Sequence, residues 1–379
     1  MPWTRRLREF VRQSDWWLFA SPILIIGLSL AVLYSISAVR AGGDLYIFKK
    51  QLVVAVIGIA AALVVSAFNY RTWQSVNVVL YISMLALLVL VLLFGQRIHS
   101  TRGWLGLGPL SFQPVEFAKL VLVIVLGGYF ARRARELNRF AYLLQSFILA
   151  ALPAGLVLLQ PDFGSAAILL ALWASLLLII GVKRRYLVGL FILGVGGIMM
   201  SWVFLFAPYQ KDRLVSFIFP SERTKSQNYN VRQAIIAIGS GEISGRGLGA
   251  GPQSQLRFLP EAGSDFIFAV VGEELGFVGV SILLGLLGLW FYRVWRLLFR
   301  CRDEFASFVL VGVLVLMFIE IFINAGMAMG VMPVVGVPFP LLSAGGSSLL
   351  AHLILIGIVA GIARQENAGG YQISRVSAI

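Results

Sequence analysis

The segment 259–279 reads LPEAGSDFIFAVVGEELGFVG, and within it a polar loop gives way to a long apolar run. Asp265 lies at this boundary, and two more acids, Glu273 and Glu274, follow inside the apolar part. An ionisable side chain at or inside a membrane boundary is costly and is usually functional. The segment therefore predicts a membrane-spanning helix that begins beside a candidate functional carboxylate, Asp265. For Glu273 and Glu274 we favour a structural role.

The composition of the whole chain is that of an integral membrane protein. Of the 379 residues, 59% are hydrophobic and 13% are charged, and the mean hydropathy is +0.89. A soluble domain carries about 25% charged residues, and a helix needs about 20 apolar residues to cross a bilayer. We find ten such runs, at residues 16–39, 51–68, 76–95, 115–131, 141–159, 164–181, 186–206, 266–292, 305–326 and 347–363. The sequence predicts an all-α protein with about ten transmembrane helices in a single domain, 1–379.

The basic residues predict the orientation of these spans, because cytoplasmic loops carry an excess of Lys and Arg. With the N-terminus inside, the cytoplasmic side receives Arg5, Arg6, Arg8, Arg12, Arg71, Arg132, Arg133, Arg135, Arg139, Lys183, Arg184, Arg185, Arg293, Arg296, Arg300, Arg302, Arg364 and Arg375. The outer short loops receive Arg40, Lys49, Lys50, Arg97 and Arg102. We expect both termini in the cytoplasm. The net charge of +14 then reflects this bias and attraction to anionic membrane lipids, and it does not indicate a nucleic-acid partner.

Residues 207–265 form a large outer loop between the seventh and eighth predicted spans. Long loops cross the membrane largely regardless of charge, and loops of this length are usually functional or disordered. This one contains basic residues, aromatic residues such as Tyr229, and the glycine-rich run IGSGEISGRGLGAGPQ. Its apolar content predicts a loop that packs against protein.

Other polar residues stand out near predicted helix ends. Pro114 suits the first turn of a helix, which places Glu116 and Lys119 three residues apart on one face. They form either a structural ion pair or part of a binding site. Asp162, in QPDFGSA, is either a helix N-cap or a functional acid.

Prolines and glycines interrupt the apolar stretch 323–350. Irregular backbone at membrane depth is tolerated where protein buries it or where it lines a cavity. Glu320 and Asn324 are one turn apart and share an inward face. The two histidines, His99 and His352, are isolated in sequence, so we expect no zinc site. Cys301 is the only cysteine, which excludes an intramolecular disulfide.

Five blocks together carry a family resemblance. They are FQPVEFAKL at 112–120, QPDFGSA at 160–166, AIGSGEISGRGLG at 237–249, FLPEAGSDFIFAVVGEELGFVG at 258–279 and PVVGVPFPLLSAGGSS at 333–348. In this order they resemble the SEDS family (shape, elongation, division and sporulation), which includes RodA, FtsW and SpoVE. The resemblance implies a peptidoglycan glycosyltransferase that polymerises lipid II at the outer face of the bacterial cytoplasmic membrane. It also implies a class B penicillin-binding protein as partner, which we expect to dock on an apolar face and on the large loop. Short termini favour RodA-like elongation over division.

The same resemblance assigns candidate roles to individual residues. Asp265 matches the catalytic aspartate of the family. The candidate substrate-binding residues are Trp104, Glu116, Lys119, Asp162, Arg213, Gln233, Ser240 and Arg246. The common Arg-Trp pair reads Gly103–Trp104 here, with Arg102 one place earlier as a candidate replacement. Two further departures are Pro252 and Ala344, at positions where the family usually has Thr and Tyr.

Inverting glycosyl transfer needs a base for the acceptor hydroxyl, and Asp265 is the candidate by analogy with inverting glycosidases. The leaving pyrophosphate needs positive charge, from basic residues of the outer loop or from a divalent cation, Mg²⁺ or Mn²⁺. We predict no site in which protein side chains alone hold a metal. The apolar bundle is expected to hold the lipid tail.

Two other classes of function compete with this one. A transporter or flippase of the same lipid precursor would also use intramembrane charges and broken helices, but near the midplane and in two related halves. In this sequence the polar groups cluster at the outer rim and in one loop. A non-catalytic scaffold for a penicillin-binding protein is the third class, and the complete motif around Asp265 argues against it.

Overall fold

The computed structural model describes residues 12–38, 44–98, 101–107, 110–204, 211, 215, 217 and 225–376. Its long helices are α2 (Trp17–Ala38), α3 (Tyr46–Ala67), α5 (Asn77–Phe94), α6 (Pro114–Arg133), α7 (Phe140–Leu158), α8 (Phe163–Ile180), α9 (Arg184–Phe204), α13 (Ile267–Leu298), α14 (Glu304–Ala328) and α15 (Gly346–Val376). Within the described residues, nine of these are long and apolar enough to cross a membrane, and α9, with 21 residues, is the remaining predicted span. The predicted class, a multi-pass α-helical membrane protein, is confirmed.

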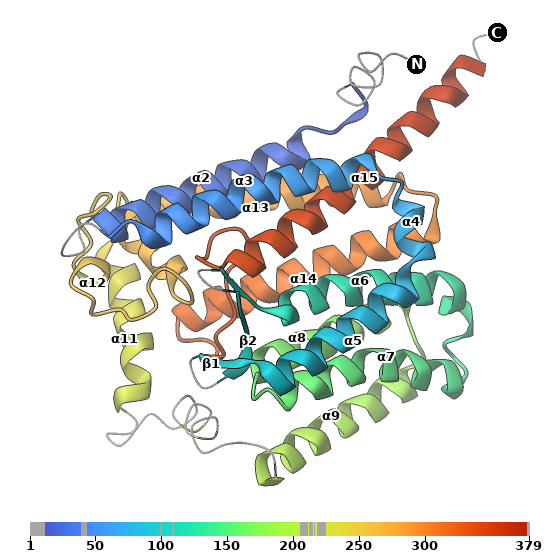
Figure 1. The fold of residues 1–379 in the computed structure, drawn as a ribbon, viewed down its shortest axis with the longest axis horizontal. Coiled ribbons are helices and arrows are strands. Elements are labelled where there is room, and N and C mark those ends of the chain that lie inside the picture. Colours follow the sequence, from blue (N-terminus) through green and yellow to red (C-terminus); the bar gives the residue numbers. More distant parts are fainter. Residues whose placement is uncertain are drawn as a thin grey trace.

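Three helices form the centre of the bundle (Figure 1). α6, α14 and α15 run through the middle, with α2, α3 and α13 on one side and α5, α7 and α8 on the other. α6 is buried nearly all round, as is the apolar part of α15. A helix that is apolar on every face is stable only when protein or lipid surrounds it. The two charged residues in the first half of α6, Glu116 and Lys119, are therefore enclosed by neighbouring helices.

Shorter elements lie between the long helices. They are α4 (Tyr70–Ser75), the 3-10 turn η1 (Ala134–Glu136), α11 (Lys225–Ser240) and α12 (Pro252–Gln255). The N- and C-termini lie at one end of the bundle, and α11 and α12 lie at the opposite end (Figure 1). The predicted large loop is thus partly helical, and α11 packs against α13.

A small antiparallel sheet was not predicted. Its strands are β1 (Gln96–Ile98), β2 (Thr101–Leu107) and β3 (Leu110–Phe112), in the order β1-β2-β3. Gln96 pairs with Trp104, and Leu105 pairs with Phe112. Strands this short give little alternation for a sequence pattern to detect. The sheet connects the end of α5 to the start of α6, and it contacts both helices.

Candidate functional site

Asp265 lies two residues before the first residue of α13 and is partly buried. Its backbone carbonyl accepts a hydrogen bond from Nδ2 of Asn324 on α14, at 2.9 Å. The same Nδ2 donates to the carbonyl of Val337, at 2.7 Å. One buried amide therefore ties the backbone of Asp265 to α14 and to the irregular segment 329–345. The inward face predicted for Asn324 is confirmed.

Two more bonds hold the residues immediately before Asp265. The hydroxyl of Ser343 donates to the carbonyl of Ser264, at 2.6 Å, and accepts from the backbone N–H of Phe339, at 2.8 Å. The N–H of Ala344 donates to the carbonyl of Gly263, at 2.8 Å. Because consecutive carbonyls from 263 to 265 are all engaged, the main chain that carries the carboxylate is fixed. This arrangement gives Ser343, the first residue of the SAGGSS block, a structural role.

The carboxylate of Asp265 faces the glycine of the segment 335–337. Its Oδ2 lies 3.6 Å from the place where a side chain on Gly336 would begin. The start of α8 also approaches this segment, since a side chain on Gly164 would come within 2.7 Å of the carbonyl oxygen of Val335. The segment 335–337 is therefore close both to Asp265 and to the N-terminus of α8, which carries Asp162.

Asp162 caps α8, as one of its two predicted readings requires. Its Oδ1 accepts from the backbone N–H of Ser165, at 3.0 Å, and its Oδ2 accepts from the Ser165 hydroxyl, at 2.8 Å. Burial raises the pKa of the Asp162 carboxyl above its usual value, against these two hydrogen bonds and the positive charge of Lys119. The cap is thus close enough to Lys119 to interact with its charge, and a second role at the site stays a prediction.

Glu116 and Lys119 form the predicted ion pair, with 2.8 Å between Oε1 and Nζ. Both side chains are buried, at 3% and 2% exposure. Lys119 also pairs with Glu320 of α14, whose other oxygen is 2.6 Å from Nε2 of His352 on α15. Nδ1 of His352 is 2.7 Å from the carbonyl of Ser348. The charges of α6, α14 and α15 therefore form one buried chain, which we call the central charge network.

The description of His352 as isolated is wrong in three dimensions, although it is correct along the sequence. Glu320 and His352 belong to different helices, and no local spacing relates them. The inward face predicted for Glu320 and Asn324 was the one available signal. The Oε2 atom of Glu116 is buried and has no hydrogen-bond partner among the described residues. The central charge network therefore contains one acceptor atom whose hydrogen bond is not satisfied within this part of the chain.

A cavity of about 660 Å³ adjoins the segment before Asp265. It is lined by Lys50 and Gln51 of α3, Trp104 of β2, and Arg257 and Ser264 of the loop that leads to α13, among others. The predicted Trp104 therefore lines the same cavity as the residue that precedes Asp265, although Asp265 itself is not among the lining residues. Lys50 and Arg257 were not predicted as site residues. They supply positive charge to this cavity.

Arg102, the candidate replacement for the family arginine, is exposed. Its Nε donates to the carbonyl of Gly95, at 3.2 Å, and its backbone N–H donates to the carbonyl of Gln160, at 3.1 Å. These contacts place Arg102 on the sheet beside Trp104. Its role toward a phosphate stays a prediction.

The remaining predicted residues lie in the large loop. Arg213 lies outside the described residues. Gln233 and Ser240 are on α11, and Arg246 follows it, with its backbone N–H donating to the carbonyl of Glu273, at 2.9 Å. Arg246 thus lies against α13 at Glu273, eight residues after Asp265. A role for Gln233, Ser240 and Arg246 in substrate binding stays a prediction.

Glu273 and Glu274 have the structural role that the sequence favoured. Glu273 accepts from the backbone N–H groups of Gln253, at 2.7 Å, and Ser254, at 3.0 Å. Glu274 accepts from the hydroxyl of Ser35, at 2.6 Å, and from the N–H of Gly249, at 3.2 Å. Both acids therefore anchor the loop 249–254 to α13.

The described residues contain no group of three or more His, Cys, Asp or Glu side chains arranged to hold a metal ion. Mg²⁺ is commonly bound by one or two carboxylates together with substrate phosphates. A divalent cation at this site would therefore depend on the substrate for part of its coordination, and it stays a proposal.

Comparison with known proteins identifies the family. The cell cycle protein family of FtsW, RodA and SpoVE matches residues 15–368. The chain belongs to this family, as the motifs indicated.

Similar proteins match at least 90% of its length. A probable peptidoglycan glycosyltransferase FtsW of Haemophilus influenzae is 35% identical, over 94% of this chain and 92% of the relative. Stage V sporulation protein E of Bacillus subtilis is 32% identical, over 90% and 94%. A chain from a structure on polymerization and crosslinking by a peptidoglycan synthase complex superposes with a TM-score of 0.77 and 31% identity, over 93% and 98%. RodA of Thermus thermophilus superposes with a TM-score of 0.68 and 30% identity, over 93% and 97%. The prediction of a SEDS-family glycosyltransferase is confirmed.

Proposed function

We propose that this protein polymerises lipid II into glycan strands at the outer face of the cytoplasmic membrane. The observation that carries the proposal is the position of Asp265. It lies on a main chain fixed by Asn324 and by the segment 337–344, at the start of a membrane-spanning helix and beside a cavity that contains Lys50, Arg257 and Trp104. A carboxylate, two cations and an aromatic side chain at a membrane boundary suit a substrate with a sugar, a pyrophosphate and a lipid tail.

In the proposed reaction Asp265 acts as general base. It accepts the proton of the acceptor sugar hydroxyl while that oxygen forms a bond to C1 of the donor sugar. The bond between C1 and the pyrophosphate oxygen breaks, and configuration at C1 inverts. Pyrophosphate leaves as an anion and takes no proton, so a second acid is not needed. The cations of Lys50 and Arg257 stabilise the charge that develops on it.

A class B penicillin-binding protein is the proposed partner. The support is the likeness to a chain from a peptidoglycan synthase complex and the exposed aromatic residues of the large loop, such as Tyr229. A role in elongation is one assignment, supported by the likeness to RodA, while the relatives named FtsW and SpoVE favour division or sporulation. Whichever class B protein stimulates polymerisation most strongly identifies the process.

The test uses purified protein, lipid II and a gel assay for glycan chain length, with and without a class B partner. Asp265→Asn should reduce polymerisation by about 100-fold or more, since a positioned base contributes about 10²–10⁴-fold. Its melting temperature and membrane insertion should match those of the wild type. Glu242→Gln is the matched control, because Glu242 is an exposed acid of the same loop that does not line this cavity. If Asp265→Asn makes glycan at the wild-type rate, Asp265 is not the base.

A further inference from the structure

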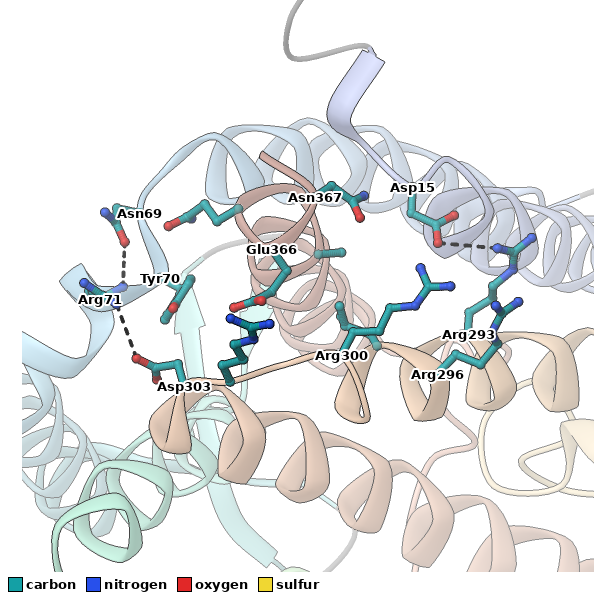
Figure 2. A pocket seen from close by; sticks show the side chains of 14 residues that line it. Asp15, Asn69, Tyr70, Arg71, Arg293, Arg296, Arg300, Asp303, Glu366 and Asn367 are labelled. Carbon is teal, nitrogen blue, oxygen red and sulfur yellow. Dashed lines mark hydrogen bonds and ion pairs between the residues drawn. The ribbon is translucent and has the colours of Figure 1, made fainter. Parts of the chain in front are cut away.

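A second large cavity, of about 810 Å³, lies at the end of the bundle that holds both termini (Figure 2). It lies at the end of α13, whereas Asp265 lies just before the start of that helix. Its walls come from residues before α2, from α4, from the end of α13 and the connection to α14, and from α15. The distribution of basic residues predicts that this end is cytoplasmic.

The cavity has a surplus of positive charge. Five arginines line it, at positions 71, 293, 296, 300 and 302, together with three acids, Asp15, Asp303 and Glu366. Two arginines are paired with acids: Arg71 with Asp303, and Arg293 with Asp15, each at 3.6 Å. For the remaining three arginines the lining contains only one further carboxylate, that of Glu366. The lining therefore carries two uncompensated positive charges.

The arginines of this surplus are arranged around one space. The side chains of Arg293 and Arg296, at the end of α13, and of Arg300, just after it, all line this cavity (Figure 2). Nε of Arg293 is buried and has no hydrogen-bond acceptor among the described residues. A buried donor without an acceptor is costly and calls for an explanation. An anion in the cavity would supply both the acceptor and the missing charge.

Exposed aromatic residues are next in sequence to several residues that line the cavity. Trp16 and Trp17 lie at the start of α2, and Tyr292, Trp295 and Phe299 lie at the end of α13, all between 45% and 72% exposed. Trp and Tyr are enriched where a membrane protein crosses the headgroup level of a bilayer. The guanidinium of Arg293 also lies over the ring of Trp17, at 5.6 Å. These side chains place the cavity at the depth of the lipid phosphates.

We propose that this cavity binds the phosphate headgroup of an anionic phospholipid from the cytoplasmic leaflet. Basic pockets between helices on that side recognise such headgroups, and each nearby Lys or Arg contributes attraction. A headgroup with two negative charges, such as that of cardiolipin, matches the surplus charge. A zwitterionic headgroup brings its own cation and does not.

Lipid retention measured by native mass spectrometry tests this proposal. Wild-type protein is loaded with cardiolipin, phosphatidylglycerol or phosphatidylcholine in separate samples. We expect retention to fall in that order. The triple variant Arg296→Gln, Arg300→Gln, Arg302→Gln should bind cardiolipin more than about tenfold less tightly. All three arginines are exposed and none forms an ion pair with a described residue, so the fold should be retained.

A matched control separates the site from general charge attraction. Arg132→Gln, Arg139→Gln, Arg184→Gln removes three exposed arginines at the same predicted side but outside the cavity, and it should change cardiolipin affinity less than about twofold. Equal losses in both triple variants would overturn the proposal, as would equal retention of all three lipids by the wild type. Displacement of cardiolipin by millimolar inorganic phosphate would reassign the cavity to a free anion. If the pocket triple variant fails to melt cooperatively, Arg300→Gln alone should still show a smaller loss.

Discussion

Lys119 is the residue on which the centre of the bundle depends. It is buried between the carboxylates of Glu116 and Glu320, on two different helices. Each of these charges has lost its water, so each is tolerable only while its partner is present. The lysine therefore connects α6 to α14, and through Glu320 to His352 on α15.

Removing the positive charge should consequently be far more damaging than removing one of the acids. Lys119→Met leaves two carboxylates with His352 alone and should cost about 3–5 kcal/mol of stability. Glu116→Gln retains the pair between Lys119 and Glu320 and should cost less. Melting and polymerisation are measured on one preparation of each variant. A stable Lys119→Met that is inactive would instead indicate substrate binding, and an unchanged variant would remove the pair from both roles.

Substitutions of Asp162 can distinguish its role as a helix cap from a role of its negative charge. Asn caps a helix as well as Asp does, whereas Ala costs about 1 kcal/mol. The pKa of the Asp162 carboxyl is raised in the folded chain, whereas in the unfolded chain it is about 4. The folded chain therefore binds a proton at Asp162 more tightly than the unfolded chain does. The resulting stability is complete below the unfolded pKa and is lost as the pH rises through the folded pKa.

The melting temperature of Asp162→Asn, relative to wild type, should therefore rise between about pH 4 and about pH 7. Asp162→Ala should be less stable than Asp162→Asn at both pH values. Parallel pH profiles for the wild type and Asp162→Asn would contradict the raised pKa. Full stability with lost polymerisation in Asp162→Asn would show that the site uses the charge.

At the scale of elements, the break in α13 organises the end of the molecule that holds α11 and α12. Gly276 has φ +64°, which interrupts the helix. The loop 241–247 fills the gap: Phe277 N–H donates to the carbonyl of Glu242, at 2.9 Å, and Val278 N–H donates to that of Ile243, at 3.1 Å. Backbone groups freed inside a membrane span must find partners in the protein. The loop is therefore part of the span rather than a covering over it.

A side chain at position 276 should push the loop 241–247 away from α13. It would meet the backbone nitrogen of Gly245 and come within 2.7 Å of the carbonyl oxygen of Ile243. Gly276→Ala should thus cost about 1–3 kcal/mol and make the loop cleavable by trypsin at Arg246. Gly285→Ala is the control, because nothing lies within 4 Å of its added methyl group, and Ala in a helix interior stabilises by about 0.5–1 kcal/mol. Equal melting temperatures for the two variants would show that the break is not required.

The spans could be predicted because each is a continuous apolar run, and its length alone decides the assignment. The break at Gly276 could not, since its run also contains Gly272, Gly279, Gly285 and Gly288 and nothing local distinguishes one glycine from another. The contact between Glu320 and His352 depends on how α14 rotates against α15, which the sequence of neither helix specifies. Asp265 could be selected because it lies at a boundary between polar and apolar sequence, but its tether to Asn324 required the fold.

At the scale of the whole molecule, the two ends of the bundle differ in kind. One end holds both termini and the arginine-lined cavity, and the other holds the sheet, α11, α12 and Asp265. Positive charge accumulates at cytoplasmic loop ends, so the first end is predicted to be inside. Glycan synthesis on the outside requires this orientation, which makes it a condition of the proposed function.

Labelling of single cysteines with a membrane-impermeant maleimide tests the orientation. Cys301, the only native cysteine, is first replaced by Ser; burial raises the pKa of its thiol, so its own reactivity is a poor reporter. Ser244→Cys and Asn138→Cys then provide exposed thiols at the two ends. In intact spheroplasts Ser244→Cys should react and Asn138→Cys should not, because six residues connect α6 to α7 on the predicted inner side. Permeabilisation should make both react. The opposite pattern would invert the protein and place Asp265 in the cytoplasm, where it could not act on an outward-facing substrate. Three predicted spans, α7, α8 and α9, lie between the two thiols, so they should be on opposite sides of the membrane. Labelling of both thiols in intact spheroplasts would mean that an even number of spans separates them, which would contradict this topology.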